Sequence, residues 1–447
     1  MSARKRGLVV SDETLINGEG LAGSEALTQK QRSAIIAGVI GNMLEWYDFG
    51  VYGYFVPVIS KLFFPASTPI VSLLLTFSVF GVGFVMRPVG SIVFGHYGDR
   101  HGRKKALSAV ILVMAVSTFV VGLLPTYDSV GVLAPLLLVL ARLAQGLSGG
   151  GEWGGAAAYL VEFAPARRRG FIGSWQQFSV GAGFLLGSLT AALLTTSLSA
   201  DDLSSWGWRV PFLLGVLVGG IGLYLRMQLD DTPKYTEMAD HGEVSGLPIR
   251  EALTTHLKPT LLAFGITLHN TVAYYAVLIY MTNWLTTAVK MPRSTALWIG
   301  TTCLCIFVVL VPLMGWISDR VGRKPMLITS CIGYIVLTYP VFYLASTGSV
   351  AYAFIGQALL VAFLAIYAGA GPAIYCELFP TRVRYTALSI GYNIPVAIFG
   401  GFAPFIATGL IQATGSILAP VYYVIAAAVA TLFTMMFVKE SAFSPLR

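Results

Sequence analysis

The sequence predicts an all-α membrane protein in which twelve transmembrane helices form two pseudo-symmetric six-helix bundles. Three observations predict this fold class: the composition, the number of long apolar segments, and an internal repeat. Of the 447 residues, 56% are hydrophobic and only 11% are charged, whereas soluble domains carry about 25% charged residues. A soluble chain of this length would form several domains, and 21 acidic and 29 basic residues cannot cover their surfaces. Most of the protein therefore lies in lipid.

Twelve apolar segments are long enough to cross a bilayer, because a helical span needs about 20 apolar residues. Glycine and proline are frequent, with 48 and 21 residues. Membrane helices tolerate both, because neighbouring helices satisfy the freed backbone groups. We expect helices at 34–60, 71–97, 106–124, 132–160, 171–197, 209–228, 259–287, 295–317, 326–344, 350–376, 388–410 and 418–438.

The basic residues predict the orientation of these helices, because Lys and Arg are retained on the cytoplasmic side. With the amino terminus inside, most of the 29 Lys and Arg fall in cytoplasmic segments, and only Lys61, Arg209, Lys290 and Arg293 fall on the opposite side. We therefore expect a multi-pass protein of the plasma membrane, in bacteria the inner membrane, with both termini in the cytoplasm. The net charge of +8 is a topology signal, so we expect no nucleic-acid partner.

An internal repeat divides the chain into two halves. Residues 95–104 read Gly-His-Tyr-Gly-Asp-Arg-His-Gly-Arg-Lys and residues 315–324 read Gly-Trp-Ile-Ser-Asp-Arg-Val-Gly-Arg-Lys, with six of ten positions identical. A second repeat relates 162–169 to 377–384, which share a glutamate, a proline and two arginines. We expect a cytoplasmic tail at 1–33, a six-helix bundle at 34–228, a cytoplasmic linker at 229–258, a second bundle at 259–438 and a cytoplasmic tail at 439–447.

The repeated Gly-x-x-x-Asp-Arg-x-Gly-Arg-Lys pattern, within six plus six helices, resembles the major facilitator superfamily. Further motifs resemble its metabolite:proton symporters, which import organic acids and osmolytes. These motifs lie at 42–49, 87–88, 142–146, 151–156 and 206–212. Within that branch, residues 272–275, 379–385 and 420–423 are most similar to proline/betaine transporters. The resemblance implies the major facilitator fold and secondary active transport.

Ionisable residues inside the predicted helices are candidates for function, because a charge at bilayer depth costs at least about 2.5–3.5 kcal/mol. In the first helix, Glu45 and Asp48 are three residues apart and share a face with Tyr52. They are the best placed carboxyls for proton coupling, which needs a group whose proton affinity differs between the inward and outward states. The alternative is that this segment only packs the first helix against its neighbours.

In the fourth helix, Arg142, Gln145 and Glu152 fall on one stripe that can face a cavity. We expect Arg142 to bind a substrate carboxylate, because a guanidinium forms a planar fork that matches two carboxylate oxygens. The alternative is a purely structural pair with Glu45 or Asp48. Glu152 is a further proton-coupling candidate, although its glycine-rich surroundings are also typical of close helix contact.

The second half supplies fewer ionisable groups at bilayer depth. His269 could carry protons near neutral pH or form a fixed hydrogen bond between helices. Tyr274 and Tyr275, with other aromatic residues of the seventh helix, could form a face for a quaternary ammonium group, or could simply pack. Asn393 on the eleventh helix completes the predicted substrate site.

The repeated loops are expected to form a cytoplasmic gate, in which charges at helix ends pair between the halves. The alternative is a set of solvated positive loops. Arg87, directly before Pro88, is expected to extend its charged end to the interface, or to support the gate. The predicted gate residues are Asp99, Arg103, Asp319, Arg323, Glu162, Arg167, Glu377 and Arg382.

We therefore expect a secondary transporter that moves a small carboxylate-bearing solute inward with protons, as a monomer, by rocking two halves about a midplane site. No phosphate-binding loop or hydrolytic triad is present, so we do not expect an enzyme. The four cysteines lack metal-ligand spacing, so we expect no metal and no cofactor other than the proton. A zwitterion such as proline or betaine is slightly favoured over a di- or tricarboxylate or aromatic acid. A membrane sensor that binds solute without moving it is a third possibility.

Overall fold

The computed structural model describes residues 29–66, 68–101, 103–150, 152–162, 164–227, 254–444 and 446. The predicted amino-terminal tail as far as residue 28, and the predicted linker as far as residue 253, lie outside the described residues. Within the described ranges the secondary structure is helical.

The amino-terminal half accounts for the first six predicted crossings. The second crossing is divided at Met86, between two helices, and the fourth is divided after Gly149. The helices of this half are α1 (Gln29–Phe63), α2 (Pro69–Val85), α3 (Arg87–His101), α4 (Arg103–Leu123), α5 (Tyr127–Val130), α6 (Leu133–Gly149), α7 (Glu152–Glu162), η1 (Ala166–Arg168), α8 (Arg169–Ser197), α9 (Ala200–Ser205), η2 (Gly207–Arg209) and α10 (Val210–Met227).

The carboxy-terminal half contains two π-helical segments, a form that occurs often at functional sites. The first lies in the seventh crossing, and the second follows Pro395, which lacks the N–H needed for regular helix hydrogen bonding. The helices are α13 (Leu257–Ala273), η3 (Tyr274–Tyr280), α14 (Met281–Thr287), α15 (Arg293–Val321), α16 (Arg323–Ala345), α17 (Val350–Glu377), α18 (Thr381–Pro395), η4 (Val396–Gly400), α19 (Ala403–Thr414) and α20 (Pro420–Met435).

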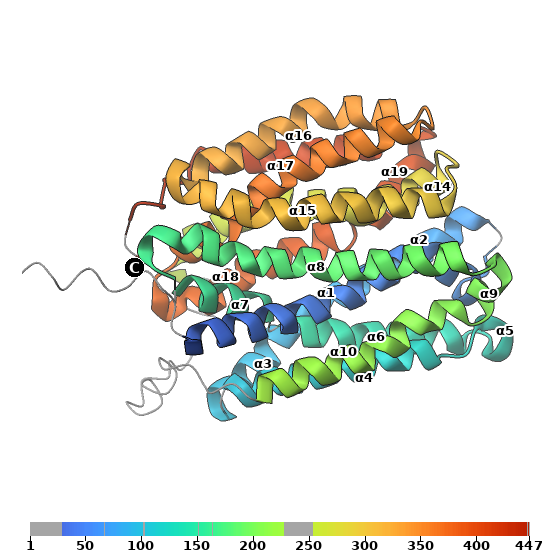
Figure 1. Ribbon diagram of the computed structural model, residues 1–447, viewed down its shortest axis with the longest axis horizontal. Coiled ribbons are helices and arrows are strands. Elements are labelled where there is room, and N and C mark those ends of the chain that lie inside the picture. The colour runs from blue at the N-terminus through green and yellow to red at the C-terminus, as the bar shows by residue number, and fades with distance from the viewer. Residues whose placement is uncertain are drawn as a thin grey trace, which may run out of the picture.

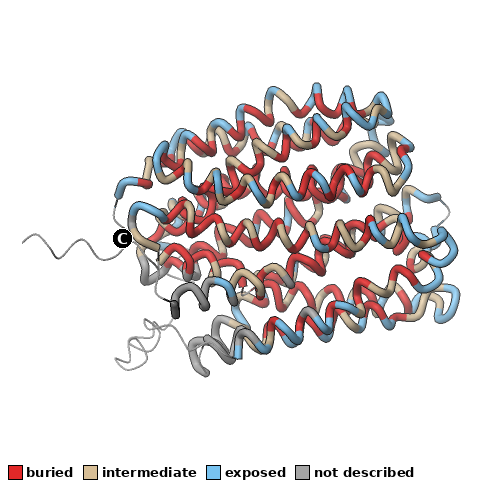
Figure 2. Tube along the Cα trace, in the orientation of Figure 1, coloured by how far each residue is buried: buried red, intermediate tan, exposed pale blue. Residues whose placement is uncertain are grey.

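The helices have the length and the outer surface of membrane spans. In the described part of the chain, nine helical stretches are long and apolar enough to cross a membrane, and Ser108–Leu123 and Pro420–Met435 are shorter apolar helices. Exposed positions recur along the outermost helices (Figure 2). They include large apolar side chains such as Leu217, Val309 and Phe433, each more than 60% exposed. Lipid accounts for such exposure, because an apolar outer surface matches the hydrocarbon of a bilayer.

The two halves contact each other along their whole length. Helices α8 and α15 lie side by side (Figure 1), while α2 packs on α19, and α7 on α17 and α18. We call the end of the bundle that carries Asp319 and Arg323 the motif end. At the opposite end, Asn283 donates to the carbonyl of Gly53 over 3.0 Å and Arg293 donates to that of Tyr54 over 3.1 Å. Contacts between the halves are therefore present at both ends.

Candidate functional site

Two arginine–carboxylate pairs lie in the core of the amino-terminal half. Arg87 Nη2 is 3.0 Å from Glu45 Oε1, and Arg142 Nη1 is 3.5 Å from Asp48 Oδ2. All four side chains are at most 3% exposed. Of the two partners considered for Arg142, the structure places Asp48 beside it. The expectation that Arg87 extends to the interface is wrong, because α3 begins deep in the bundle and its first side chain pairs with Glu45.

Glycines on α6 bring these charges together. A Cβ atom at Gly146 would overlap the carbonyl oxygen of Gly83 on α2, and one at Gly150, which follows α6, would overlap that of Arg87. A Cβ atom at Gly149 would lie 2.5 Å from Glu45 Oε1. The close approach of α6 to α2 and α3 therefore requires residues without side chains.

Arg142 has more N–H donors than its described neighbours accept. Its Nη1 also donates to Gln145 Oε1 over 2.8 Å, and Gln145 in turn donates to Thr118 Oγ1 over 3.0 Å. The guanidinium carbon lies 4.3 Å from the ring centroid of Tyr52. Nε and Nη2 have no hydrogen-bond partner among the described residues. Because arginine offers five N–H donors in a fixed fork, these two can bind an anionic group.

Arg87 lies close to Arg142 and is similarly placed. Its guanidinium carbon is 4.6 Å from the ring centroid of Phe84 and 4.8 Å from those of Trp46 and Phe49. Nε and Nη1 also have no hydrogen-bond partner within the described ranges. The amino-terminal half thus presents two buried guanidinium groups with available donors.

Aromatic side chains from both halves meet near these arginines. Tyr275 on η3 contacts Phe84 edge-on, with ring centroids 5.3 Å apart. Trp153 on α7 stacks on Tyr392 of α18, at 3.5 Å and 6°, and Tyr375 contacts both rings edge-on. Sequence reasoning missed Trp153 and Tyr392. The position of Trp153 within the glycine cluster of the fourth helix was the available signal.

The other residues predicted for substrate binding are distributed more widely. Tyr274 packs on Phe184 and Phe307, and Asn393 donates to Ser91 Oγ across the two halves over 3.3 Å. The seventh-helix aromatic residues do not form one cluster, because Trp284 donates to the carbonyl of Ile417 and lies toward the opposite end.

His269 lies inside the carboxy-terminal half, separate from the carboxyls of α1. Its Nε2 is 3.2 Å from Ser330 Oγ, and its ring contacts Tyr334 and Tyr367 edge-on at 4.6 and 5.2 Å. This arrangement matches the fixed hydrogen bond between helices that the sequence left as one alternative.

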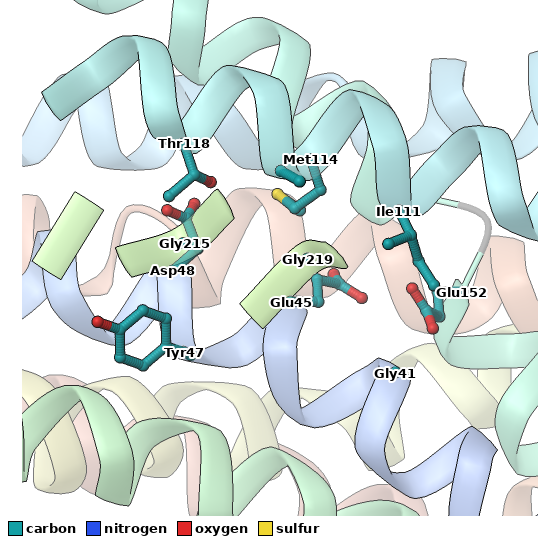
Figure 3. Close-up of a pocket in the computed structure, with 11 residues that line it drawn as sticks. Gly41, Glu45, Tyr47, Asp48, Ile111, Met114, Thr118, Glu152, Gly215 and Gly219 are labelled. Atoms are coloured by element: carbon teal, nitrogen blue, oxygen red, sulfur yellow. The ribbon is translucent and has the colours of Figure 1, made fainter. Parts of the chain in front are cut away.

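The three candidate proton-coupling carboxyls of the amino-terminal half line one pocket. Glu45 and Asp48 reach it from α1 and Glu152 from α7 (Figure 3). Helices α4 and α10 form the rest of its wall through Met114, Thr118, Gly215 and Gly219, among others. The complete lining consists of Gly41, Glu45, Tyr47, Asp48, Ile111, Met114, Ala115, Thr118, Glu152, Gly215 and Gly219.

At the motif end, Asp319 joins the two halves. Its carboxylate oxygens accept the backbone N–H groups of Gly170 and Phe171 over 2.7 and 2.8 Å. These are unpaired donors of the first turn of α8, where a negative charge is favourable. Arg323, four residues after Asp319, pairs with it, with Nη2 2.9 Å from Asp319 Oδ1. The same Nη2 lies 3.5 Å from Glu377 Oε1. One predicted gate residue, Asp319, therefore binds the other half through backbone donors, and a second, Arg323, holds Asp319.

The second repeat forms crossed ion pairs between the halves. Glu162 of the first half pairs with Arg384 of the second at 2.7 Å, and Glu377 of the second half lies 3.8 Å from Arg169 of the first. The sequence predicted Arg167 and Arg382, two residues earlier in each copy. Of these, Arg167 is exposed. The side chains of Asp99, Arg103 and Arg382 lie outside the described residues.

The segment after α20 also binds at the motif end. Glu440 accepts the backbone N–H groups of Arg323 and Lys324 over 3.0 and 2.9 Å, and Arg169 donates to the carbonyl of Ser444 over 2.8 Å. Burial raises the pKa of the Glu440 carboxyl, but hydrogen bonds from four backbone N–H groups lower it, so the pKa lies below its ordinary value.

Comparisons with known proteins show the family of this chain. The family described as Sugar (and other) transporter matches residues 34–245 and again residues 237–447. The chain is 37% identical to the glycine betaine/proline/ectoine/pipecolic acid transporter OusA of Dickeya dadantii, over 93% of this chain and 85% of that one. It is 36% identical to the proline/betaine transporters of Salmonella typhimurium and Escherichia coli, over 94% of this chain and 85% of theirs.

Solved structures show the same fold. The major facilitator superfamily proton:xylose symporter XylE, bound to 6-bromo-6-deoxy-D-glucose, matches with a TM-score of 0.77 at 18% identity, over 93% of this chain and 98% of that chain. The partially occluded inward open form of the xylose transporter XylE from E. coli matches with a TM-score of 0.75. The predicted fold of twelve membrane helices in two bundles is confirmed. The chain belongs to the Sugar (and other) transporter family of the major facilitator superfamily, and it is a membrane transporter rather than an enzyme.

Proposed function

We propose that this transporter is a proton symporter that imports a zwitterionic osmolyte such as proline or glycine betaine. The observation that carries the proposal is Arg142: it is fully buried, pairs with Asp48, and keeps two donor groups without partners among the described residues. The names of the relatives support the same substrate class.

Exchange of partners at Arg142 would couple the proton to the substrate. When the substrate carboxylate approaches, Asp48 competes with it for the guanidinium. A proton on Asp48 removes that competition and neutralises a carboxyl that would otherwise lose its ion pair with Arg142 at bilayer depth. The guanidinium of Arg142 and the substrate carboxylate then form a neutral ion pair, and the loaded protein can change between its inward and outward orientations.

The cationic end of a zwitterion would contact the aromatic rings near the arginines. Tyr275, Trp153 and Tyr392 supply aromatic rings from both halves, and it is the ring face that attracts a cation, because the ring edge is positive. A cation over such a ring gains about 0.5–2 kcal/mol, and quaternary ammonium groups need no hydrogen-bond acceptor. Tyr52, Gln145, Tyr274 and Asn393 would complete the wall of the site.

A second candidate substrate class is an organic acid with two or more carboxylates, such as citrate or 2-oxoglutarate, or an aromatic acid such as shikimate or phthalate. The observation in its favour is that Arg87 also has donors without partners within the described ranges. Two guanidinium groups could hold two carboxylates, provided that nearby acids were protonated.

We also propose the orientation and the working unit. The motif end faces the cytoplasm, so that the crossed pairs of Glu162 with Arg384 and of Glu377 with Arg169 form the cytoplasmic gate. Both termini are then cytoplasmic, the membrane is the bacterial inner membrane, and one chain is sufficient for transport. The excess of basic residues at this end supports the orientation.

The test is a thermal-shift panel on detergent-purified protein with proline, glycine betaine, citrate, 2-oxoglutarate, shikimate and phthalate at pH 5.5 and 7.5. A ligand that binds the folded state raises its melting temperature. Stabilisation by proline or betaine alone supports the proposal. Stabilisation by an acid, stronger at pH 5.5, would replace the zwitterion with the organic-acid class.

A further inference from the structure

We infer that the pocket lined by Glu45, Asp48 and Glu152 is the binding site of the coupling proton, and that the proton reaches Asp48 through Glu152, inside the amino-terminal half. This inference rests on the proposed proton symport and adds a site and a route to it. The substrate reaches Arg142 from the other side, between the two halves.

The position of the pocket separates the two routes. All of its lining residues belong to α1, α4, α7 and α10 of the amino-terminal half. Two aromatic rings of the proposed substrate site, Phe84 and Trp153, instead contact Tyr275 of η3 and Tyr392 of α18 in the other half. Asp48 belongs to both the pocket and the proposed substrate site, because it lines the pocket and pairs with Arg142.

The carboxyls form a series along the pocket. Figure 3 shows Asp48 beside Thr118 at one end, Glu152 beside Ile111 at the other, and Glu45 between them. Asp48 is 1% exposed, and its Oδ1 has no hydrogen-bond partner among the described residues. A buried carboxylate oxygen without a donor is costly, so this oxygen is a site for a proton.

The charges of the surrounding side chains also favour one bound proton. Three carboxyls and two guanidiniums lie among the described charged groups here, so the described carboxyls outnumber the described guanidiniums. Protonation of one carboxyl removes a negative charge at bilayer depth, where a charge is costly. The described titratable or charged groups around the pocket and its two arginines are Glu45, Tyr47, Asp48 and Tyr52 on α1, Arg87 on α3, Arg142 on α6, Glu152 on α7, Tyr275 on η3 and Tyr392 on α18.

The transfer is a simple proton relay. Glu152 takes a proton from water, and the proton then passes to the carboxylate of Glu45, which lies between the other two carboxyls, and from Glu45 to the carboxylate of Asp48. Glu152 returns to the ionised form, and Arg142 is released from Asp48 to bind the substrate carboxylate. Glu152 is therefore a positioning and relay residue that does not touch the substrate.

The test compares exchange with proton-driven accumulation in proteoliposomes, using radiolabelled proline or betaine and an internal pH-sensitive dye. Exchange at equal pH needs no net proton movement, whereas accumulation does. We expect Glu152→Gln to exchange within about twofold of wild type but to lose at least fivefold of its accumulation and of the accompanying proton uptake. Glu152→Asp should restore both, and the exposed carboxyl change Asp201→Asn should match wild type.

Wild-type accumulation by Glu152→Gln, with an unchanged pH profile, would overturn the route through Glu152. If that variant does not fold, Met114→Phe fills the pocket without removing a charge, and unaffected accumulation there would overturn it equally. Other results would contradict the proposed function itself. These are a lack of proton uptake with substrate by the wild-type protein, or substrate uptake that is driven by a sodium gradient. If Asp48→Asn uncouples transport and Glu152→Gln does not, only the route through Glu152 is wrong.

Discussion

Single side chains account for the chemistry of this site. Arg87 and Arg142 are fully buried in a chain that is otherwise poor in charge, and each is held by one carboxylate of α1. A buried ion pair is weak evidence for stability, because desolvation offsets most of the attraction between the charges. Their available N–H donors are better explained by a ligand than by the stability of the fold.

Replacement of Arg142 by lysine should raise the KM for uptake at least tenfold. Lysine keeps the charge, but it cannot present the Nε and Nη2 donors to two carboxylate oxygens. A charge-assisted hydrogen bond is worth about 1.5–3 kcal/mol, and about 1.4 kcal/mol corresponds to a factor of ten. Initial uptake rates over a range of substrate concentrations measure this.

The matched control is Arg320→Lys, because Arg320 is exposed and lies over Trp316 at 3.4 Å. It should leave the KM unchanged. Equal KM values for Arg142→Lys and wild type would show that Arg142 only holds Asp48.

Much of this site could be predicted from the sequence, because ionisable residues in apolar segments are rare and are easily recognised there. Glu45, Asp48, Arg142 and Glu152 were found in this way. Which acid pairs with which arginine depends on helix packing, so the sequence left the partner of Arg142 open. Arg87 was misplaced because its distance from the predicted end of the helix suggested the interface.

At the scale of helices, periodic apolar segments predicted the crossings well. Helix α16, for example, covers Arg323–Ala345, and the prediction was 326–344. The break at Met86 and the π-helical segments η3 and η4 were not predicted. Pro88 lies two residues after the break and Pro395 directly before η4, whereas no local residue pattern marks η3. The glycines that face neighbouring helices were recognised, but their partners were not.

The contact between α6 and α2 should be sensitive to a single methyl group. A Cβ atom at Gly146 would overlap the Gly83 carbonyl, and overpacking of this kind typically costs about 1–3 kcal/mol, occasionally more. Gly146→Ala should therefore lower the melting temperature and reduce uptake, since the shift moves Arg142. Fluorescence-detected melting in detergent measures the first effect.

Gly409→Ala is the matched control. No atom lies within 4 Å of a Cβ at Gly409 in α19, and alanine is the better helix former. Its melting temperature should equal or exceed that of wild type. Equal melting of Gly146→Ala and wild type would contradict the close packing of α6 on α2.

Helix α16 should contribute a pH-dependent part of the stability through Glu440. Its pKa is lower in the folded state than in the unfolded state, so its contribution is complete above the unfolded value and is lost as the pH falls through the folded value. Glu440→Gln should therefore lower the melting temperature more at pH 7 than at pH 3. A difference that does not depend on pH would show that the ionised carboxylate is not what stabilises the start of α16.

At the scale of the whole molecule, the two halves are related in sequence and in their contacts. Glu162 and Arg169 of the first half correspond to Glu377 and Arg384 of the second, and each glutamate lies beside the arginine of the other half. The sequence repeat predicted charges that pair between the halves at this end, and the structure shows that Arg384 and Arg169 are the partners of Glu162 and Glu377. Separation of the halves at this end must break both pairs and release Asp319 from the start of α8.

The central claim is that the protein accumulates a zwitterionic solute at the expense of a proton gradient. The most direct measurement is uptake of radiolabelled glycine betaine and proline into proteoliposomes with an imposed pH gradient, acidic outside, with and without a protonophore. We expect accumulation above the external concentration that collapses when the protonophore is added. Saturable binding without accumulation, or accumulation that does not respond to the pH gradient, would contradict the account.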